Sequence, residues 1–113
     1  MTVRVYRPAT LADLARIVAD GELPASADVV VAPDDDEETE YAALMTAADL
    51  SAELLGGPGR RVVVVAETDG EDAPVRLDQV VAVHADTAAD PGPEEDLGWY
   101  APSEIGHLAQ ESR

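Results

Sequence analysis

Four consecutive valines followed by an alanine, Val62-Val63-Val64-Val65-Ala66, decide the expected fold. β-Branched residues favour strands, and a short apolar run without polar alternation is typical of a strand that is buried on both faces. The run follows Gly56-Gly57-Pro58-Gly59, a cluster that separates it from the preceding segment. We therefore expect residues 62–66 to form the central strand of a sheet.

The segment before this strand has the pattern of a long helix over residues 37–55. It opens with acidic residues, which the positive end of a helix dipole favours, and the glycine-proline cluster at residues 56–59 ends it. Apolar residues repeat at helical spacing on one expected face, namely Tyr41, Leu44, Met45, Ala48, Ala52 and Leu55.

The N-terminal third predicts a strand, a helix and a second strand. Val3 to Tyr6 alternate as in a strand that Pro8 ends, and Thr10 with Asp13 has the form of a capping box for a helix that Gly21 stops. The run 29–32, Val-Val-Val-Ala, is a candidate buried strand. This order favours a right-handed βαβ unit with parallel strands.

Shorter elements follow the central run. Strands are expected at residues 75–77 and 80–85, an exposed acidic loop at 87–98, and a short terminal helix that Ser103 caps.

Together these patterns predict one small domain over residues 1–113 of the α/β or α+β class. We expect a mixed sheet of about five strands with a βαβ start, packed against two to three helices.

Composition restricts the possible functions. The chain of 113 residues has a formal net charge of -17 and a pI near 4.1, which disfavours direct binding to nucleic acid. It contains no cysteine, in keeping with a reducing cytoplasm, and no apolar run long enough for a membrane span. Every basic residue is arginine, while lysine, asparagine and phenylalanine are absent. This usage is expected from a genome rich in G and C; a halophile is the alternative source.

Several short blocks resemble a family of small actinobacterial proteins of unknown function. The blocks are Val3-Arg4-Val5-Tyr6, Pro8-Ala9-Thr10-Leu11, Glu40-Tyr41-Ala42-Ala43-Leu44, Trp99-Tyr100-Ala101 and Glu104-Ile105. The resemblance implies a cytoplasmic protein of a high-GC bacterium. It carries no known activity, cofactor or site residue with it.

Candidate catalytic residues are His84, Asp86 and Glu104. His84 and Asp86 stand two apart on an expected strand, so their side chains would share a face and could share a proton. Glu104 or His107 would have to complete the group from the terminal helix. The alternative is a structural histidine that is hydrogen-bonded to a neighbour.

The acidic run at residues 34–40 suggests a calcium or magnesium site, because these cations prefer carboxylate oxygens. However, it lacks the glycine and spacing of a calcium loop, and acidic residues are also favoured at a helix start. We therefore predict no metal site and no cofactor.

Trp99 and Tyr100 are half of the four aromatic residues. They either pack in the core or leave one ring exposed as an anchor for a partner, since tryptophan and tyrosine are enriched in interface hot spots.

Two functions fit these residues. The first is a non-enzymatic binding or regulatory module whose acidic surface meets a basic protein partner, with Trp99 or Tyr100 as the contact. The second is a small hydrolase or transferase that uses a metal or a general base. A third interpretation is that the acidity only keeps the domain in solution.

Overall fold

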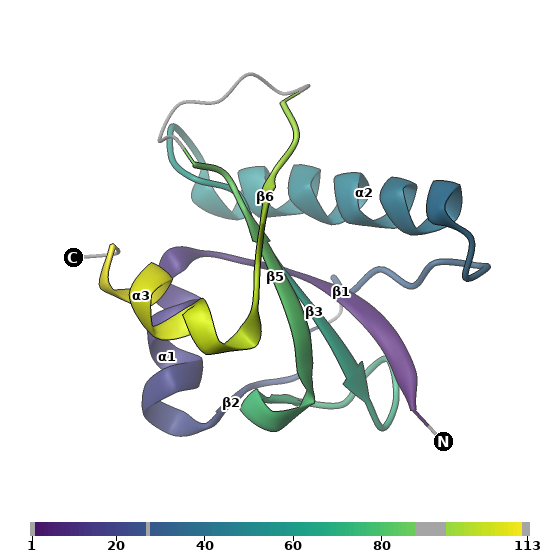
Figure 1. Ribbon diagram of the computed structural model, residues 1–113, viewed down its shortest axis with the longest axis horizontal. Coiled ribbons are helices and arrows are strands. Elements are labelled where there is room, and N and C mark those ends of the chain that lie inside the picture. Colours follow the sequence, from purple (N-terminus) through teal and green to yellow (C-terminus); the bar gives the residue numbers. More distant parts are fainter. Residues whose placement is uncertain (1, 27, 88–94, 112–113) are drawn as a thin grey trace.

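The computed structural model describes residues 2–26, 28–87 and 95–111. Its main sheet has the strand order β1-β3-β5-β6, and each neighbouring pair is antiparallel. A small second sheet pairs β2 with β4. Figure 1 shows α2 on one face of the main sheet and α1 with α3 on the other. In chain order the elements are β1 (Val3–Ala9), α1 (Leu11–Asp20), β2 (Glu22–Leu23), α2 (Glu37–Leu55), β3 (Val62–Thr68), β4 (Val75–Arg76), the 3-10 turn η1 (Leu77–Gln79), β5 (Val80–Ala85), β6 (Gly98–Tyr100), the 3-10 turn η2 (Pro102–Glu104) and α3 (Ile105–Gln110).

Strand β3 is the central strand, as predicted. It lies between β1 and β5, and its alternate residues are buried in two separate cores. Val62 and Val64 pack on the side of α1 and α3, whereas Val63 and Val65 pack under α2. Helices therefore cover both faces of an antiparallel sheet, and the fold is α+β, one of the two classes that the sequence predicts.

The predicted βαβ start is wrong. Residues 29–32 form no ladder: Val30 makes one antiparallel bridge to the outer edge of β1, where the Tyr6 N–H donates to the Val30 carbonyl at 2.8 Å. Backbone N–H groups of alternate residues point to the same edge of a strand, so Pro8 faces that edge with no N–H to donate. Pairing therefore cannot extend from Val30 toward residue 28, and the ladder partner of β1 is the antiparallel strand β3.

The same geometry explains why Pro8 does not end the first strand. β1 continues to Ala9, and Pro8 pairs in register with Val63 of β3. An edge strand tolerates proline when the missing N–H faces away from the ladder.

Helix α2 has the predicted bounds. The Asp36 side chain accepts from the Thr39 N–H at 2.8 Å, and Gly56 ends the helix with a φ of 67°. The face that packs on the sheet differs from the expected one. Its buried members are small, namely Ala43, Ala47, Ala48 and Ser51, while Tyr41 is exposed.

The last third follows the prediction with local changes. The expected strand at residues 75–77 shortens to β4, and β5 matches its predicted range. In the expected loop at 87–98, residues 88–94 lie outside the described residues and Gly98 already belongs to β6. Ser103 lies inside η2, and its side chain does not cap α3. None of the described helices has the length and apolarity needed to cross a membrane.

Candidate functional site

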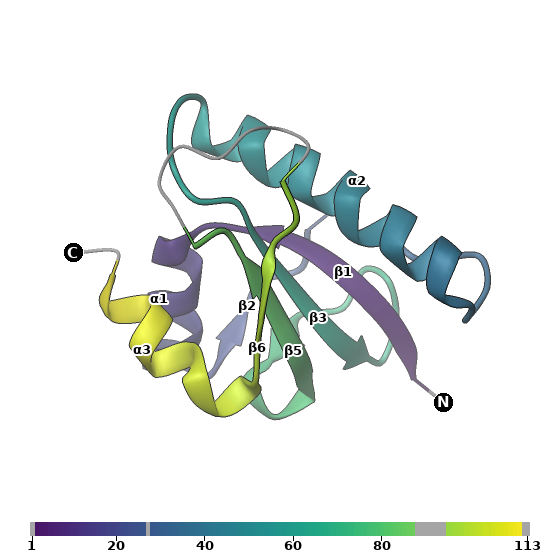
Figure 2. The same ribbon diagram turned by 45° about the horizontal axis from the view of Figure 1, so that its top comes forward.

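Helix α2 covers only half of its sheet face. It packs against β1 and β3, as Figure 2 shows, and does not extend over β5 and β6. On this face Ala82 of β5 is buried in the core under α2, whereas His84 is half-buried and Trp99 is reachable from solvent. Trp99 of β6 is the most exposed large apolar residue among those described, with 62% of its surface accessible.

The uncovered strip is hollowed into a groove of about 360 Å³ between α2 and β6. Tyr41 and Leu44 line it from α2, and Trp99 lines it from β6. The antiparallel register places His84 directly opposite Trp99, so the imidazole lies beside the indole. We call this cavity the aromatic groove; its lining residues are Arg4, Tyr6, Glu40, Tyr41, Leu44, Val65, Val81, Ala82, His84 and Trp99.

A bulge in the pairing of β3 with β5 shapes this groove. Val65 pairs with Ala82, whereas the next residue of β3, Ala66, pairs with Val80. Val81 is thus the extra residue, and it lines the groove while remaining exposed. Bulges redirect side chains and raise the local strand twist. Here the bulge adds an apolar side chain to the accessible strip.

His84 is half-buried in this groove. Burial lowers the pKa of its imidazole below the ordinary value of 6.5, because the charged form loses solvation. The ring is therefore neutral at neutral pH, with one nitrogen able to donate and the other able to accept a hydrogen bond. Within the described part of the chain the side chain has no hydrogen-bond partner.

A side-chain hydrogen bond links the groove residue Tyr41 of α2 to the segment that precedes β6. The Tyr41 hydroxyl donates to Asp96 Oδ1 at 2.7 Å, joining α2 to the segment that leads into β6. This bond raises the pKa of the Tyr41 hydroxyl. It also holds Tyr41 at the groove although the ring is largely exposed.

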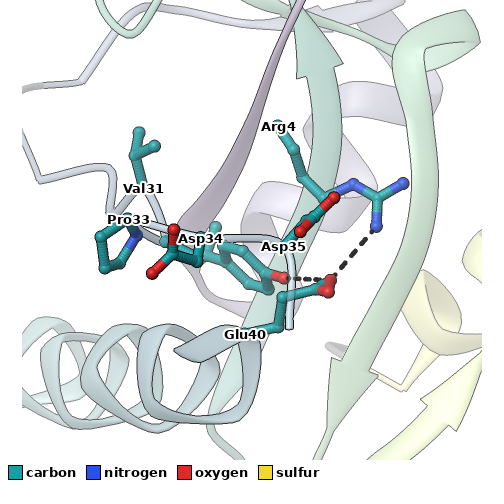
Figure 3. Close-up of a pocket in the computed structure, with 8 residues that line it drawn as sticks. Arg4, Val31, Pro33, Asp34, Asp35 and Glu40 are labelled. Carbon is teal, nitrogen blue, oxygen red and sulfur yellow. Dashed lines mark hydrogen bonds and ion pairs between the residues drawn. The ribbon is translucent and has the colours of Figure 1, made fainter. Parts of the chain in front are cut away.

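A second cavity of about 530 Å³ adjoins the first and shares Arg4, Tyr6 and Glu40 with it. Figure 3 shows the Glu40 carboxylate pointing toward the Arg4 guanidinium. Glu40 Oε1 accepts from Arg4 Nη1 at 3.4 Å and from the Tyr6 hydroxyl at 3.3 Å. Burial, and after it the Glu40 charge, raises the pKa of Tyr6. We call this cavity the acidic pocket; Val31, Ala32 and Pro33 complete its lining.

The structure does not bring the predicted catalytic residues together. Asp86 lies beyond the end of β5, and its carboxylate binds Arg61 instead of His84, with Nε to Oδ2 at 2.8 Å and Nη2 to Oδ1 at 2.9 Å. Glu104 lies in η2, where its carboxylate accepts from the Ala101 N–H at 3.4 Å. His107 is exposed on α3. Only His84 lines the aromatic groove.

The Arg61–Asp86 pair is structural. Both side chains are almost fully buried, and the Arg61 backbone N–H also donates to Asp86 Oδ2 at 2.8 Å. The hydrogen bonds that the guanidinium donates to Asp86 raise its pKa. The pair fixes the start of β3 against the end of β5.

The two aromatic residues of β6 point to opposite faces, as alternate residues of a strand do. Trp99 lines the aromatic groove, whereas Tyr100 packs against the core beneath α1 and α3.

The acidic run at residues 34–40 has two structural roles: Asp36 caps α2, and Asp34, Asp35 and Glu40 line the acidic pocket. Over residues 2–26, 28–87 and 95–111, no three histidine, aspartate or glutamate side chains are placed to hold a metal ion.

The sequence does not indicate a shared site for Arg4, Tyr6 and Tyr41, and it suggests Glu40 only as part of the acidic run 34–40. Tyr41 fits the helical repeat of α2 and is therefore expected in the core, while Arg4 and Tyr6 look like the polar face of a strand. Only the long-range packing of α2 across β1 places them at one cavity.

Comparison with known protein families places the chain. A profile described as a family of unknown function, DUF6912, matches residues 3–109. The chain belongs to this family. The match spans every residue of the aromatic groove and the acidic pocket and confirms the expected uncharacterised family. No curated protein and no solved structure shows significant similarity to this DUF6912 chain.

Proposed function

We propose that this DUF6912 protein is a non-enzymatic binding module that takes a basic polypeptide partner in its aromatic groove. The observation that carries the proposal is the exposed Trp99 indole on the sheet strip that α2 leaves uncovered. Exposed apolar patches on a small domain mark interaction surfaces, and tryptophan is the residue most enriched in interface hot spots.

The charge of the chain supports a basic partner. The formal net charge is -17, and carboxylates surround the groove at Glu40, Asp96 and the acidic pocket. Such a field attracts cations over several ångströms and repels the phosphates of nucleic acid. A polypeptide with cationic and apolar residues complements both the charge and the apolar lining of the groove.

The test is binding of a labelled peptide of alternating leucine and arginine, measured by fluorescence anisotropy. Trp99→Ala is expected to abolish binding while leaving the melting temperature unchanged, because the side chain packs little against the core. Val18→Ala, a change at an exposed residue of α1, is the matched control and should bind like the parent. Equal binding by both variants, or a large loss of stability in Trp99→Ala, would contradict the proposal.

A second candidate function rests on His84. A neutral imidazole with a burial-lowered pKa in an open groove can act as a general base, which supports a small hydrolase or transferase. Neither Asp86 nor Glu104 orients this imidazole. Hydrolysis of ester and phosphoester reporter substrates that His84→Gln abolishes would favour this function over the binding module.

We infer that the protein works in the cytoplasm of a high-GC actinobacterium. The absence of cysteine suits a reducing compartment, and the exclusive use of arginine as the basic residue suits a genome rich in G and C. Cell fractionation followed by immunodetection tests the location.

A further inference from the structure

Glu40 has unused capacity to accept hydrogen bonds. An ionised carboxylate offers about four lone-pair sites. Here Oε1 accepts two long contacts, from Arg4 at 3.4 Å and from Tyr6 at 3.3 Å, while Oε2 accepts none from the described residues. The carboxylate lies where the aromatic groove meets the acidic pocket and lines both. It can therefore receive a donor that enters from either cavity.

Arg4 binds the Glu40 carboxylate weakly. Its side chain is 49% exposed, and its guanidinium divides its contacts between Glu40 at 3.4 Å and Glu67 at 4.0 Å. Exposed pairs of this kind stabilise a protein little, and the geometry here is far from the short bidentate contact that arginine and a carboxylate can form. A competing guanidinium with better geometry can displace it.

The charge around Glu40 favours a cation as the competitor. Asp34 and Asp35 line the acidic pocket together with Glu40, and Arg4 is the only cationic residue in its lining. The indole of Trp99 and the phenol of Tyr41 line the adjoining groove. Guanidinium groups stack on such rings and bind carboxylates in a fork, whereas an ammonium is a compact, strongly hydrated charge.

We propose that Glu40 selects an arginine of the basic partner. In the free protein, Arg4 occupies the position on Glu40 that the partner's guanidinium takes on binding. The partner's guanidinium displaces Arg4 from Glu40, and the apolar residue next to it in the partner packs against Trp99. The proposal rests on the proposed function, because it assumes that a basic polypeptide occupies the aromatic groove. It adds the chemical identity of the recognised side chain and an internal competitor for it.

The experiment uses Trp99 as its reporter, since it is the single tryptophan of the chain and lines the groove. Peptides of alternating leucine with arginine, lysine or glutamine, all without aromatic residues, are titrated into the protein at low salt. We expect a saturable change of Trp99 emission and the tightest binding for the arginine peptide. The lysine peptide should bind about threefold more weakly, and the glutamine peptide should give no saturable change.

Variants then test the two roles separately. Glu40→Gln should weaken the arginine peptide about fivefold and remove its advantage over the lysine peptide. Glu53→Gln makes the same charge change at an exposed position of α2 outside both cavities and should leave that advantage intact. Arg4→Gln should tighten binding about threefold, whereas Arg16→Gln, a change to another exposed arginine on α1, should tighten it less.

The outcomes separate this proposal from the proposed function. If the arginine peptide binds and Trp99→Leu weakens it in a calorimetric titration, but Glu40→Gln behaves like Glu53→Gln, the groove binds basic peptides and the role of Glu40 is wrong. If Arg4→Gln binds no better than Arg16→Gln, the role of Arg4 as an internal competitor is wrong. If no basic peptide changes the Trp99 emission, both proposals fail together.

Discussion

Asp86 and Arg61 form the most buried ion pair of the described structure, with side chains 2% and 5% exposed. Two charges removed from water need each other, because a lone buried charge keeps its solvation penalty without compensation. The Asp86 carboxylate also accepts the Arg61 backbone N–H. Asp86 therefore fixes the start of β3 against the end of β5. It is not one of the residues that line the aromatic groove.

Asp86→Asn is expected to destabilise the protein by about 3 kcal/mol, since it removes the carboxylate charge that contacts the buried Arg61 guanidinium. Urea unfolding followed by circular dichroism measures the change. Asp78→Asn removes an exposed carboxylate that contacts Arg76 at 3.3 Å and should change stability by less than about 0.5 kcal/mol. Similar losses of unfolding free energy in the two variants would show that the buried pair stabilises the protein no more than the exposed one does.

His84 predicts a specific response to pH. Its pKa in the folded state is below the ordinary value of 6.5, so the unfolded chain binds the proton more readily than the folded one. The contribution of His84 to stability is complete above pH 6.5 and is lost as the pH falls from there through the folded pKa. Unfolding free energies measured between about pH 7 and pH 5 should therefore fall less steeply in His84→Gln than in the parent.

His107→Gln is the control for this measurement, because His107 is exposed on α3, and α3 lies on the face of the sheet opposite α2 and the groove. It should retain the slope of the parent. A His84→Gln variant with the parental slope would mean that burial of the imidazole does not disfavour its charged form.

At the scale of elements, the narrow buried face of α2 produces the groove. Ala43, Ala47 and Ala48 are small and let the helix lie close to β1 and β3. The large side chains of α2 on this side, Tyr41 and Leu44, line the groove instead of filling it. The strip with His84 and Trp99 consequently stays open, and the bulge at Val81 widens its apolar surface.

The end of α2 offers a test of the helix signals. Gly56 has a φ of 67°, a left-handed conformation that a side chain disfavours, whereas Gly57 has no positive φ and open space around its Cα. Gly56→Ala should cost about 1 kcal/mol in thermal unfolding. Gly57→Ala should be neutral or slightly stabilising, because it only lowers the entropy of the unfolded chain. Equal effects at both positions would contradict this account of the helix end.

At the scale of the whole molecule, the excess of carboxylates controls association. A formal charge of -17 on 113 residues produces a negative field that extends about a Debye length, roughly 10 Å at 0.1 M salt. Salt screens this field, while contacts already formed in the groove are screened less.

The association rate of the arginine-leucine peptide should therefore fall steeply as salt rises from about 0.02 to about 0.5 M, with a smaller change in the dissociation rate. Stopped-flow fluorescence of Trp99 measures both rates. An association rate that does not depend on salt would show that the acidic surface does not steer the partner, and that the acidity has another purpose, such as keeping the protein in solution.

Several features followed from local sequence signals. The four valines of β3 predict a central strand because a β-branched run without polar residues must be buried on both faces. The bounds of α2 follow from the acidic N-terminal turn and from Gly56. The left-handed backbone conformation of this glycine ends a helix without help from distant parts of the chain. The lack of cysteine and the net charge are properties of composition alone.

Only the tertiary structure decided which distant segments meet. The run at residues 29–32 has the composition of a buried strand, but it makes a single bridge to the outer edge of β1, whose ladder partner is the distant strand β3. Likewise, strand alternation suggests that Asp86 lies beside His84, yet the buried guanidinium of Arg61 takes the carboxylate and leaves the imidazole opposite Trp99. Local patterns determine elements because their causes lie within a few residues, whereas strand pairing and site assembly depend on partners that lie far away in the chain.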